Sequence, residues 1–445
     1  MDNLNLFQRI RFAESELNNL VEFNKEDVFL WKKQVGRYFH IGVHWLNIQP
    51  LYYSIKESRF STRLWSDVSN DEIGKQLYSA FGYLALGRTL TKDIHFLLCD
   101  ECLVVDNKGK LLKKIKNRDF AIDVLRETKS STISTEKLND VYLARLQKFK
   151  TSQIILPLSG GYDSTYLALL TREFKSVKSF TYAQSILRFL DKEACSARLN
   201  ADKLQLSWRR INLNYDMNYL REWRLEFKSV THDHGMYHYE FFENIANYVS
   251  TPDAYVLSGI VGDVWAGKHT IKQKINSVEE YSKLFLSHEY SVLNHREFTK
   301  ATLDFLNGKL KDQSSILAEP NGRLIQLVRN KMVLLNYMMK SAFNSGFVFI
   351  TPFLSAELVQ ATLSVKKREE RLWQKELFSR YALVADSKSL IGTSNAQFLR
   401  EARARRIVSR TQFLLYSILL VFRLDRFLKL PLKKELIKRK FEWKN

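Results

Sequence analysis

The sequence predicts an α/β protein whose larger domain is built on a parallel β-sheet and carries a helical half, preceded by a smaller α+β domain. From about residue 151, short apolar segments alternate with helical segments through short links, as in βαβ units whose sheet is covered on both faces. Gly and Pro are scarce, at 16 and 6 residues, which favours long helices over an all-β fold with many turns. A chain of 445 residues is too long for a single core, so we expect more than one domain.

The composition is that of a folded protein. Hydrophobic residues make up 45% and charged residues 26% of the chain, which excludes a mostly disordered one. Cys99, Cys102 and Cys195 are too few, and odd in number, for a disulfide framework, so we expect a reducing compartment. The start shows no secretory signal peptide, and the longest apolar run, 413–422, covers about half of the roughly 20 residues that a bilayer requires. We therefore predict a cytoplasmic protein.

The chain is strongly basic. Its formal net charge of +21 favours phosphate-rich partners such as a nucleotide, a nucleic acid or anionic lipid. The predicted C-terminal tail, 401–445, holds much of the excess, because from Arg400 onward 14 Lys and Arg residues accompany only four acidic ones. One interpretation of the tail is an amphipathic helix resting on the anionic inner face of the membrane. The other is a helix packed on the larger domain, and the residues leave both open.

The first predicted domain, 1–150, mixes short strands with helices. Alternating apolar and polar residues predict strands at 39–45, 51–55 and 102–105. One helix is expected to begin at 69–72, where capping and acidic residues precede an apolar pattern, and a second helix is expected over 119–149.

The second predicted domain, 151–400, begins with the alternating segments. Strands are expected at four places, 154–158, 178–183, 208–213 and 255–257. Helices are expected between them, at 163–174, 191–204 and 235–249, and helices alone from 277 to 385.

A glycine-rich loop joins the first strand of this sheet to its first helix and reads Ser159-Gly160-Gly161-Tyr162-Asp163-Ser164. It stands beyond the carboxyl end of a strand, where a parallel sheet presents ligands. Two adjacent glycines let the backbone fold closely around an anion, the following helix offers free N–H groups to a phosphate, and the serines add hydroxyl donors. Asp163 beside a phosphate implies an intervening Mg²⁺, and the lysine of a Walker A loop is missing. The alternative is a turn without a ligand, but the complete motif in this position favours a nucleotide site.

Three segments together resemble the asparagine synthetase branch of the ATP-pyrophosphatase enzymes, also called PP-loop or adenine nucleotide alpha-hydrolase-like proteins. The loop 159–164 is similar to the pyrophosphate loop of that family, Ser-Gly-Gly-x-Asp-Ser. The segment 257–267 resembles its Leu-Ser-Gly-Glu-Gly-Ala-Asp-Glu-x-x-Gly-Gly, and 351–358 resembles its Val-Pro-Phe-Leu-Asp-x-Glu-Leu. The likeness covers residues 150–390, with fitting order and spacing.

The resemblance implies that ATP is cleaved to AMP and pyrophosphate while a carboxylate is adenylated and then attacked by an amine, which gives an amide. It implies that Asp163 and Asp263 hold Mg²⁺ on the ATP phosphates and that Ser159, Gly160, Gly161 and Ser164 cradle them. It also implies that Gly259 lets the backbone approach the nucleotide and that the strand 180–183 lines the adenine. A lysine is expected to stabilise the adenylate, and the candidates are Lys388 and, as second choice, Lys375.

Two positions depart from the family. Ile260 stands where asparagine synthetases have Glu, and Ile can neither bind an amine nor move a proton. Ser355 replaces an Asp, so the substrate side differs. The run 262–269 is similar to asparagine synthetase-like proteins encoded with bacterial surface-polysaccharide machinery, which implies an amide on a sugar acid, either small or lipid-linked. His269 in this run is a candidate substrate contact.

The front half resembles the later part of the class II glutaminase (Ntn) domain, through the segments 82–90 and 103–109. That domain uses an N-terminal cysteine as its nucleophile, whereas position 2 is Asp2 and the first cysteine is Cys99. The resemblance therefore implies a degenerate domain kept as a scaffold. Free ammonia, another amine or a separate glutaminase would then supply the nitrogen.

Three other interpretations stay open. The first is a cyclase that forms an internal amide, of β-lactam or lasso-peptide type. The second is an RNA-modifying or nucleic-acid-binding protein, although no RNA-binding module is recognisable. The third is a non-catalytic homologue. Cys99 with Cys102, and His232 with His234, have metal-like spacing without further ligands, so we expect buried thiols and a polar loop instead.

Overall fold

The computed structural model describes most of the chain between residues 30 and 385. The described ranges are 30–66, 68–128, 132–183, 192–213, 217–227, 230–231, 237–249, 254–287 and 298–385. They belong to one compact unit, Met1–Ser387. The tail 401–445, with both of its interpretations, and Lys388 lie outside the described residues. The expected domain boundary near residue 150 stays a prediction.

The N-terminal part forms two small antiparallel sheets. Their strand orders are β1-β2-β6-β7 and β4-β3-β5. The strands are β1 (Leu30–Val35), β2 (Tyr38–Val43), β3 (Tyr52–Ser54), β4 (Arg59–Ser61), β5 (His95–Phe96), β6 (Glu101–Val105) and β7 (Leu111–Lys116). The strands predicted at 39–45, 51–55 and 102–105 are confirmed as β2, β3 and β6.

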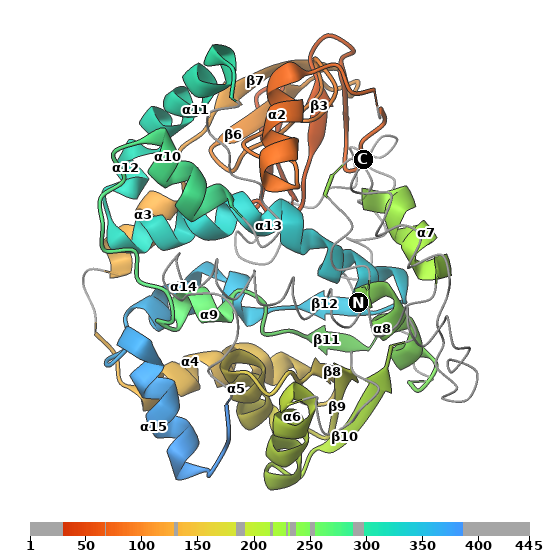
Figure 1. Cartoon of the computed structure of the whole chain (residues 1–445), viewed down its shortest axis with the longest axis vertical. Coiled ribbons are helices and arrows are strands. Elements are labelled where there is room, and N and C mark those ends of the chain that lie inside the picture. Colours follow the sequence, from red (N-terminus) through yellow and green to blue (C-terminus); the bar gives the residue numbers. More distant parts are fainter. Residues whose placement is uncertain are drawn as a thin grey trace, which may run out of the picture. The chain divides into compact units, whose positions relative to one another are not determined.

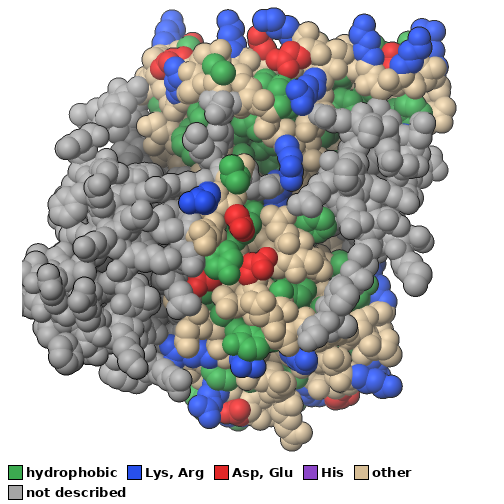
Figure 2. All heavy atoms as spheres, turned by 90° about the vertical axis from the view of Figure 1, so that its right-hand side faces the viewer, with side chains coloured by type: hydrophobic (Ala, Val, Ile, Leu, Met, Phe, Trp, Pro, Cys, Tyr) green, Lys and Arg blue, Asp and Glu red, His purple; other side chains and the backbone are tan. Residues whose placement is uncertain are grey.

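Lysines occupy the outer strands of the four-stranded sheet. Lys33 on β1, and Lys113 and Lys116 on β7, are exposed at its two edges. Lys and Arg side chains also gather along the upper border of the face drawn in Figure 2. Charged edge strands resist pairing with other chains. Part of the basic excess therefore has a structural explanation that involves no anionic partner.

The first helices show where capping decides a boundary. They are α2 (Glu72–Phe81), α3 (Ala121–Thr128), α4 (Thr135–Leu146) and the short 3-10 helix η2 (Gln147–Phe149). Asp71 caps α2 by accepting the Gly74 N–H at 2.6 Å, so the predicted start at 69–72 is confirmed. The single helix predicted over 119–149 is wrong. Ser134 accepts the Lys137 N–H and starts α4 as a separate helix, because a capping hydroxyl satisfies an N–H at a helix beginning.

A five-stranded parallel sheet forms the centre of the larger part, as the sequence predicts. Its strands are β8 (Gln153–Pro157), β9 (Ser176–Ala183), β10 (Ser207–Asn212), β11 (Tyr255–Leu257) and β12 (Val348–Ile350). The order is β10-β9-β8-β11-β12, and all neighbouring pairs are parallel. The chain thus starts in the middle of the sheet, builds one side and then returns to build the other.

The strand β12 corrects the prediction of helices alone from 277 to 385. Gly346, in the left-handed region with a φ of 86°, ends the preceding helix, and three apolar residues then pair with β11. A short apolar run carries no periodicity that separates a buried strand from a helix. Only the partner strand decides its conformation.

The remaining helices follow in the larger part of the chain. Several lie beside the parallel sheet, whereas the helix at 300–312 lies beside the N-terminal sheets (Figure 1). The helices of this part are α5 (Tyr162–Thr171), α6 (Lys192–Lys203), α7 (Met217–Phe227), α8 (Tyr237–Ala246), α9 (Gly262–Trp265), α10 (Val278–Tyr281), the π-helix η4 (Ser282–Leu286), α11 (Lys300–Asp312), α12 (Ser314–Leu317), α13 (Pro320–Asn344), the 3-10 helix η6 (Pro352–Leu354), α14 (Ala356–Leu363), the 3-10 helix η7 (Glu369–Arg371) and α15 (Leu372–Arg380). Among the described helices, none combines the length and the apolar character of a membrane-spanning segment.

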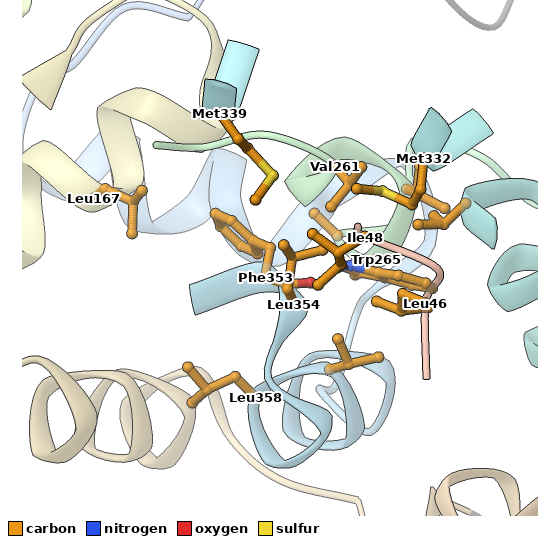
Figure 3. Packing of buried hydrophobic residues seen from close by; sticks show 14 of the residues in the cluster. Leu46, Ile48, Leu167, Val261, Trp265, Met332, Met339, Phe353, Leu354 and Leu358 are labelled. Carbon is orange, nitrogen blue, oxygen red and sulfur yellow. Dashed lines mark hydrogen bonds between the residues drawn. The ribbon is translucent and has the colours of Figure 1, made fainter. Parts of the chain in front are cut away.

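The long helix α13 lies between the N-terminal sheets and the parallel sheet (Figure 1). Leu46 and Ile48 from the N-terminal part pack in the same cluster as Met332 of α13 and as Phe353 and Trp265 (Figure 3). Burial of large apolar side chains stabilises the fold by about 1.5–3 kcal/mol each. This cluster extends through both parts, while the N-terminal sheets keep a second cluster of their own around Leu30, Ile41 and Leu103.

Candidate functional site

The loops that follow β8 and β11 meet where the strand order of the parallel sheet reverses. The chain leaves β8 toward β9 on one side, and it later returns to β11 on the other side of β8. In open parallel sheets, ligands bind outside the carboxyl ends of the strands at such a switch point. The topology thus predicts a ligand site at this edge of the sheet.

Hydrogen bonds within the glycine-rich loop hold its shape. Ser159 Oγ and Ser164 Oγ lie 3.0 Å apart, and the Ser159 N–H donates to Ser164 Oγ at 3.1 Å. Gly161 is the N-terminal cap of α5, and no side chain caps that end. The hydroxyls stabilise the loop from within, and because no side chain caps α5 at Gly161, the positive end of this helix suits an anion.

Glycine is the only residue type that fits at position 160. Its φ of 69° lies in the left-handed region, and a Cβ there would come within 2.8 Å of Glu193 O and Ser196 Cβ on α6. A side chain would therefore strain the backbone and push α6 away from the loop. This glycine serves the packing of α6 as well as any ligand.

Two further glycines let the loop after β11 touch the loop after β8. A Cβ at Gly259 would lie 2.9 Å from Ser164 N, and a Cβ at Gly262 would lie 2.9 Å from Asp163 Cβ and Cγ. Because Asp263 follows Gly262 directly, this contact brings the second loop, with its aspartate, against Asp163.

Replacing Gly262 with Ala is expected to separate the two loops. The added methyl group would clash with Asp163 and with Phe353 Cε2, also at 2.9 Å, and overpacking of this kind costs about 1–3 kcal/mol of folding free energy. Urea unfolding of the purified variant measures this loss.

Gly308→Ala provides the matched control. Gly308 lies exposed within α11, and a Cβ there meets nothing within 4 Å, so the change is expected to stabilise the protein by about 0.5–1 kcal/mol. A Gly262→Ala variant as stable as the wild type would contradict the close approach of the loops.

Five charged or titratable side chains gather at the two loops. Asp163 Oδ2 lies 3.6 Å from Arg371 Nη2. Asp263 Oδ2 lies 3.8 Å from Lys268 Nζ and 3.4 Å from His269 Nε2. None of these side chains is more than 23% exposed. The charges of the two carboxylates and of the two basic side chains, Lys268 and Arg371, therefore balance within a largely buried cluster.

The environment separates the pKa values of the two carboxyl groups. Burial raises the pKa of Asp163 to about 6, although the charge of Arg371 opposes the rise, and the negative charge of Asp263 adds to it. Burial acts in the same direction on Asp263, but the adjacent His269 ring and the charges of Lys268 and Arg371 bring its pKa well below the ordinary value. Such divergence is typical of carboxylates that share one site.

Several buried polar atoms of this cluster have no hydrogen-bond partner among the described residues. They are Asp163 Oδ1, His269 Nε2, Arg371 Nε and Nη2, and both amide atoms of Gln374, whose side chain lies beside Asp163. An unsatisfied buried polar group costs about 1–3 kcal/mol. Concentration of such groups in one place indicates a site that a ligand or ion completes.

The donor set fits a magnesium ion shared with a ligand. Mg²⁺ prefers oxygen ligands and is commonly held by one or two carboxylates together with substrate phosphates. Asp163 and Asp263 provide two carboxylates, one of them with an unsatisfied oxygen. Groups of three or more His, Cys, Asp or Glu that could hold a metal do not occur in the described ranges.

The structure brings most of the predicted site residues to this edge of the sheet. Ser159, Gly160 and Gly161 lie in the loop after β8, and Asp163 and Ser164 lie in the first turn of α5. Gly259 lies in the loop after β11, and Asp263 lies in α9, which follows that loop. Their binding of nucleotide and metal stays a prediction. Lys375 is exposed on α15, whereas Lys388 is outside the described residues.

Sequence reasoning missed three members of the cluster as site residues. Lys268 stands in the run that also contains Asp263 and His269, so its position was a usable signal. Arg371 and Gln374 come from η7 and α15, where the sequence shows no motif. Ile260 is partly buried and packs against the main core.

The cysteine pair Cys99 and Cys102 shows the buried thiols that the sequence predicts rather than a reactive site. Cys102 is buried on β6 and Cys99 is half-buried. Burial raises the pKa of the Cys102 thiol to about 11, and it also raises the pKa of Cys99 well above its ordinary value, so neither thiol is poised to react. His232 and His234 lie outside the described residues.

Fold and site together define a doubly wound α/β protein with a charged, partly unsatisfied cluster at its switch point. No family model matches the chain, and no curated protein matches it. Among solved structures it is similar to an NH3-dependent NAD synthetase from Campylobacter jejuni, at 19% identity over 47% of this chain and 93% of that one, with a TM-score of 0.24. It is also similar to an NMN synthetase from Francisella tularensis, at 13% identity over 57% and 97% and a TM-score of 0.22. A U34-tRNA thiolase from Methanococcus maripaludis shares 8% identity over 68% and 77%, with a TM-score of 0.25. TM-scores this low support no functional argument. The function is therefore argued from the geometry of the site.

Proposed function

We propose that this chain is an ATP-dependent ligase, asparagine synthase-like in its chemistry, that adenylates a carboxylate, releases pyrophosphate and forms an amide. One observation carries the proposal. Asp163 and Asp263, a hundred residues apart in the chain, lie at one site beside the uncapped N-terminus of α5. Paired carboxylates next to an anion-binding helix end suit a magnesium nucleotide.

Each part of the site has a task in this reaction. Asp163 and Asp263 would hold the Mg²⁺, which when bound neutralises phosphate charge and eases the departure of pyrophosphate. The N–H groups at the start of α5 would bind phosphate oxygens. Lys268 adds a positive charge in a region where it is only 14% exposed, and low exposure strengthens its attraction to developing negative charge.

The acid substrate is proposed to be a sugar acid of surface-polysaccharide synthesis. Ile260 offers no acid–base group where the resembling enzymes carry Glu, which disfavours aspartate with ammonia bound in the usual way. The similarity of the run 262–269 to polysaccharide-linked proteins supports the sugar acid. Nitrogen would come from ammonia, another amine or a separate glutaminase.

A pyrophosphate-release screen tests the function. The full chain would be mixed with Mg-ATP, ammonium and one sugar acid at a time, and the products would be identified by mass spectrometry. Parallel reactions would omit the acid, omit the ammonium, or contain tRNA in place of the acid. We expect release that depends on one acid and an amide product. A dehydrated product without ammonium would indicate a cyclase, release only with tRNA would indicate an RNA-modifying enzyme, and no release with any acid would support a non-catalytic homologue.

Replacing Lys268 with Met is expected to lower pyrophosphate release by about 100- to 1000-fold, the effect of removing one preorganised electrostatic contact. Lys272→Met is the matched control, because Lys272 is 74% exposed and pairs with the exposed Glu369. Initial rates under saturating Mg-ATP measure both variants. Equal rates for the two variants would exclude Lys268 from the chemistry.

A further inference from the structure

Arg371 carries a buried guanidinium group whose bonding is incomplete. Its side chain is 9% exposed, and Nε and Nη2 have no hydrogen-bond partner in the described part of the chain. The 3.6 Å between Nη2 and Asp163 Oδ2 is too long for a hydrogen bond. A guanidinium is an obligate donor, so this group lacks an acceptor that the site must receive from elsewhere.

The position of this guanidinium points to a negatively charged acceptor. It lies over the ring of Tyr162, 5.1 Å from the ring centroid, and Tyr162 in turn stacks on Phe378 of α15 at 5.4 Å and 12°. Tyr162 is the first residue of α5. A cation beside the positive end of a helix is unfavourable unless negative charge offsets it there, and the one carboxylate in the first turn of α5, Asp163, also faces the charge of Lys268.

The backbone holds Arg371 in place at a cost. Glu370 and Arg371 both adopt left-handed conformations, with φ of 51° and 57°, which costs non-glycine residues about 1–3 kcal/mol each. Contacts with the Asp263 loop maintain this arrangement. A Cβ at Gly267 would lie 1.7 Å from Arg368 O, and Trp373 Nε1 donates to Ala266 O at 3.1 Å. The strained segment and the second aspartate loop are therefore fastened together.

We infer that Arg371 binds the pyrophosphate end of the nucleotide, an inference that rests on the proposed function. Phosphate oxygens at the start of α5 would accept the two unpaired N–H groups, and the planar fork of arginine matches phosphate geometry. The negative charge of the phosphate oxygens would offset the positive charge of the guanidinium and of the first turn of α5. Arg371 would thus bind the β- and γ-phosphates of ATP, and the binding of AMP, which lacks them, would not depend on Arg371.

Calorimetry on the full chain tests this inference with three probes, Mg-ATP, Mg-pyrophosphate and Mg²⁺ with AMP. Arg371→Met is expected to weaken the binding of Mg-ATP and of Mg-pyrophosphate about 10- to 100-fold, because charge-assisted hydrogen bonds are lost. AMP binding is expected to change less than about twofold, because its phosphate does not need the guanidinium. Arg371→Lys keeps the charge but loses the planar guanidinium, so its affinity for Mg-ATP is expected to lie between those of the wild type and Arg371→Met. Arg380→Met, which removes an exposed arginine from the adjoining helix α15, is the matched control.

Stability of the ligand-free protein gives a second readout. Removing the guanidinium takes away a buried positive charge that lies 3.6 Å from Asp163 Oδ2, so Arg371→Met is expected to lower the urea midpoint, whereas Arg371→Lys, which keeps the charge, is expected to stay near the wild type. A midpoint lowered as much in Arg371→Lys as in Arg371→Met would make the guanidinium a structural group and would overturn the inference.

The outcomes separate the inference from the function beneath it. A wild type that binds none of the probes would refute the proposed function. A wild type that binds them, with Arg371→Met binding equally well, would refute only the role of Arg371. Unchanged nucleotide binding with a raised KM for the acid substrate would assign the guanidinium to that carboxylate and would equally overturn the inference.

Discussion

Replacing Asp163 or Asp263 with Asn is expected to lower pyrophosphate release by at least about 1000-fold, which corresponds to about 4 kcal/mol of transition-state stabilisation. Asn keeps the size of the side chain but removes the charge that would hold Mg²⁺. Isothermal titration with Mg-ATP and initial-rate measurements check binding and chemistry separately. Asp304→Asn, an exposed position on α11, is the control and should act like the wild type.

The two aspartate variants are expected to differ in stability. Asp163 has a raised pKa, so the fold disfavours its charge, whereas Asp263 has a lowered pKa because His269, Lys268 and Arg371 favour the charge against burial. A group stabilised as an anion in the fold loses that stabilisation on neutralisation. Asp263→Asn should therefore lower the urea midpoint at pH 7 more than Asp163→Asn. Wild-type rates in both variants would place metal and nucleotide elsewhere.

Breaking the buried Arg329–Asp119 pair is expected to cost about 3–5 kcal/mol of folding free energy. Arg329 on α13 is 2% exposed at its side chain and donates to both oxygens of Asp119, at 2.8 and 2.7 Å. Its Nε also donates to Trp45 O at 2.7 Å. Arg329→Met leaves a buried carboxylate and a buried carbonyl without partners, which is the costly half of removing an ion pair.

The pH dependence of this loss follows from Asp119. Burial alone would raise its pKa, but the charge and hydrogen bonds of Arg329, with the Ala121 N–H, hold the pKa below its ordinary value. The pair therefore contributes its full stability above the unfolded pKa of about 3.9 and loses it as the pH falls through the lower folded pKa. The difference between wild type and Arg329→Met should be largest near neutral pH and shrink in acid.

An exposed ion pair is the control for this prediction. Arg380 and Glu136 lie 3.0 Å apart with side chains 59% and 63% exposed, and such pairs contribute about 0–1 kcal/mol. Urea unfolding of Arg380→Met and Arg329→Met at several pH values measures both. A small loss in Arg329→Met at neutral pH would show that the two parts of the chain do not depend on this contact.

The strand–loop–helix unit at Ser159 was predictable because its signals are local. An apolar strand, two adjacent glycines and a following helical pattern lie within a short stretch, and each residue acts on its own backbone. The alternation that follows was sufficient to predict a parallel sheet, since parallel neighbours require crossovers of the kind that helices provide. The errors fell where local signals were weak, at β12 and at the break before α4.

The cluster around Asp163 depended on the tertiary structure. The resemblance paired Asp163 with Asp263, but only the contact at Gly262 brings their loops together. Arg371 and Gln374 reach the site from a segment that no motif marks, and their importance lies in hydrogen bonds that they do not make. Such a property has no sequence pattern, because it depends on which neighbours are absent.

By itself, the sequence determined the class of fold, the loop at the carboxyl end of β8 and the expectation of a phosphate ligand. These follow from side-chain periodicity and backbone preference, which act over a few neighbouring residues. Only the tertiary structure decided that α13 joins both parts through Arg329, that β12 completes the sheet and that five charged or titratable side chains share one buried cluster. The reason is physical: burial and electrostatic coupling depend on distances in space, and residues far apart in the chain acquire those distances only when it folds.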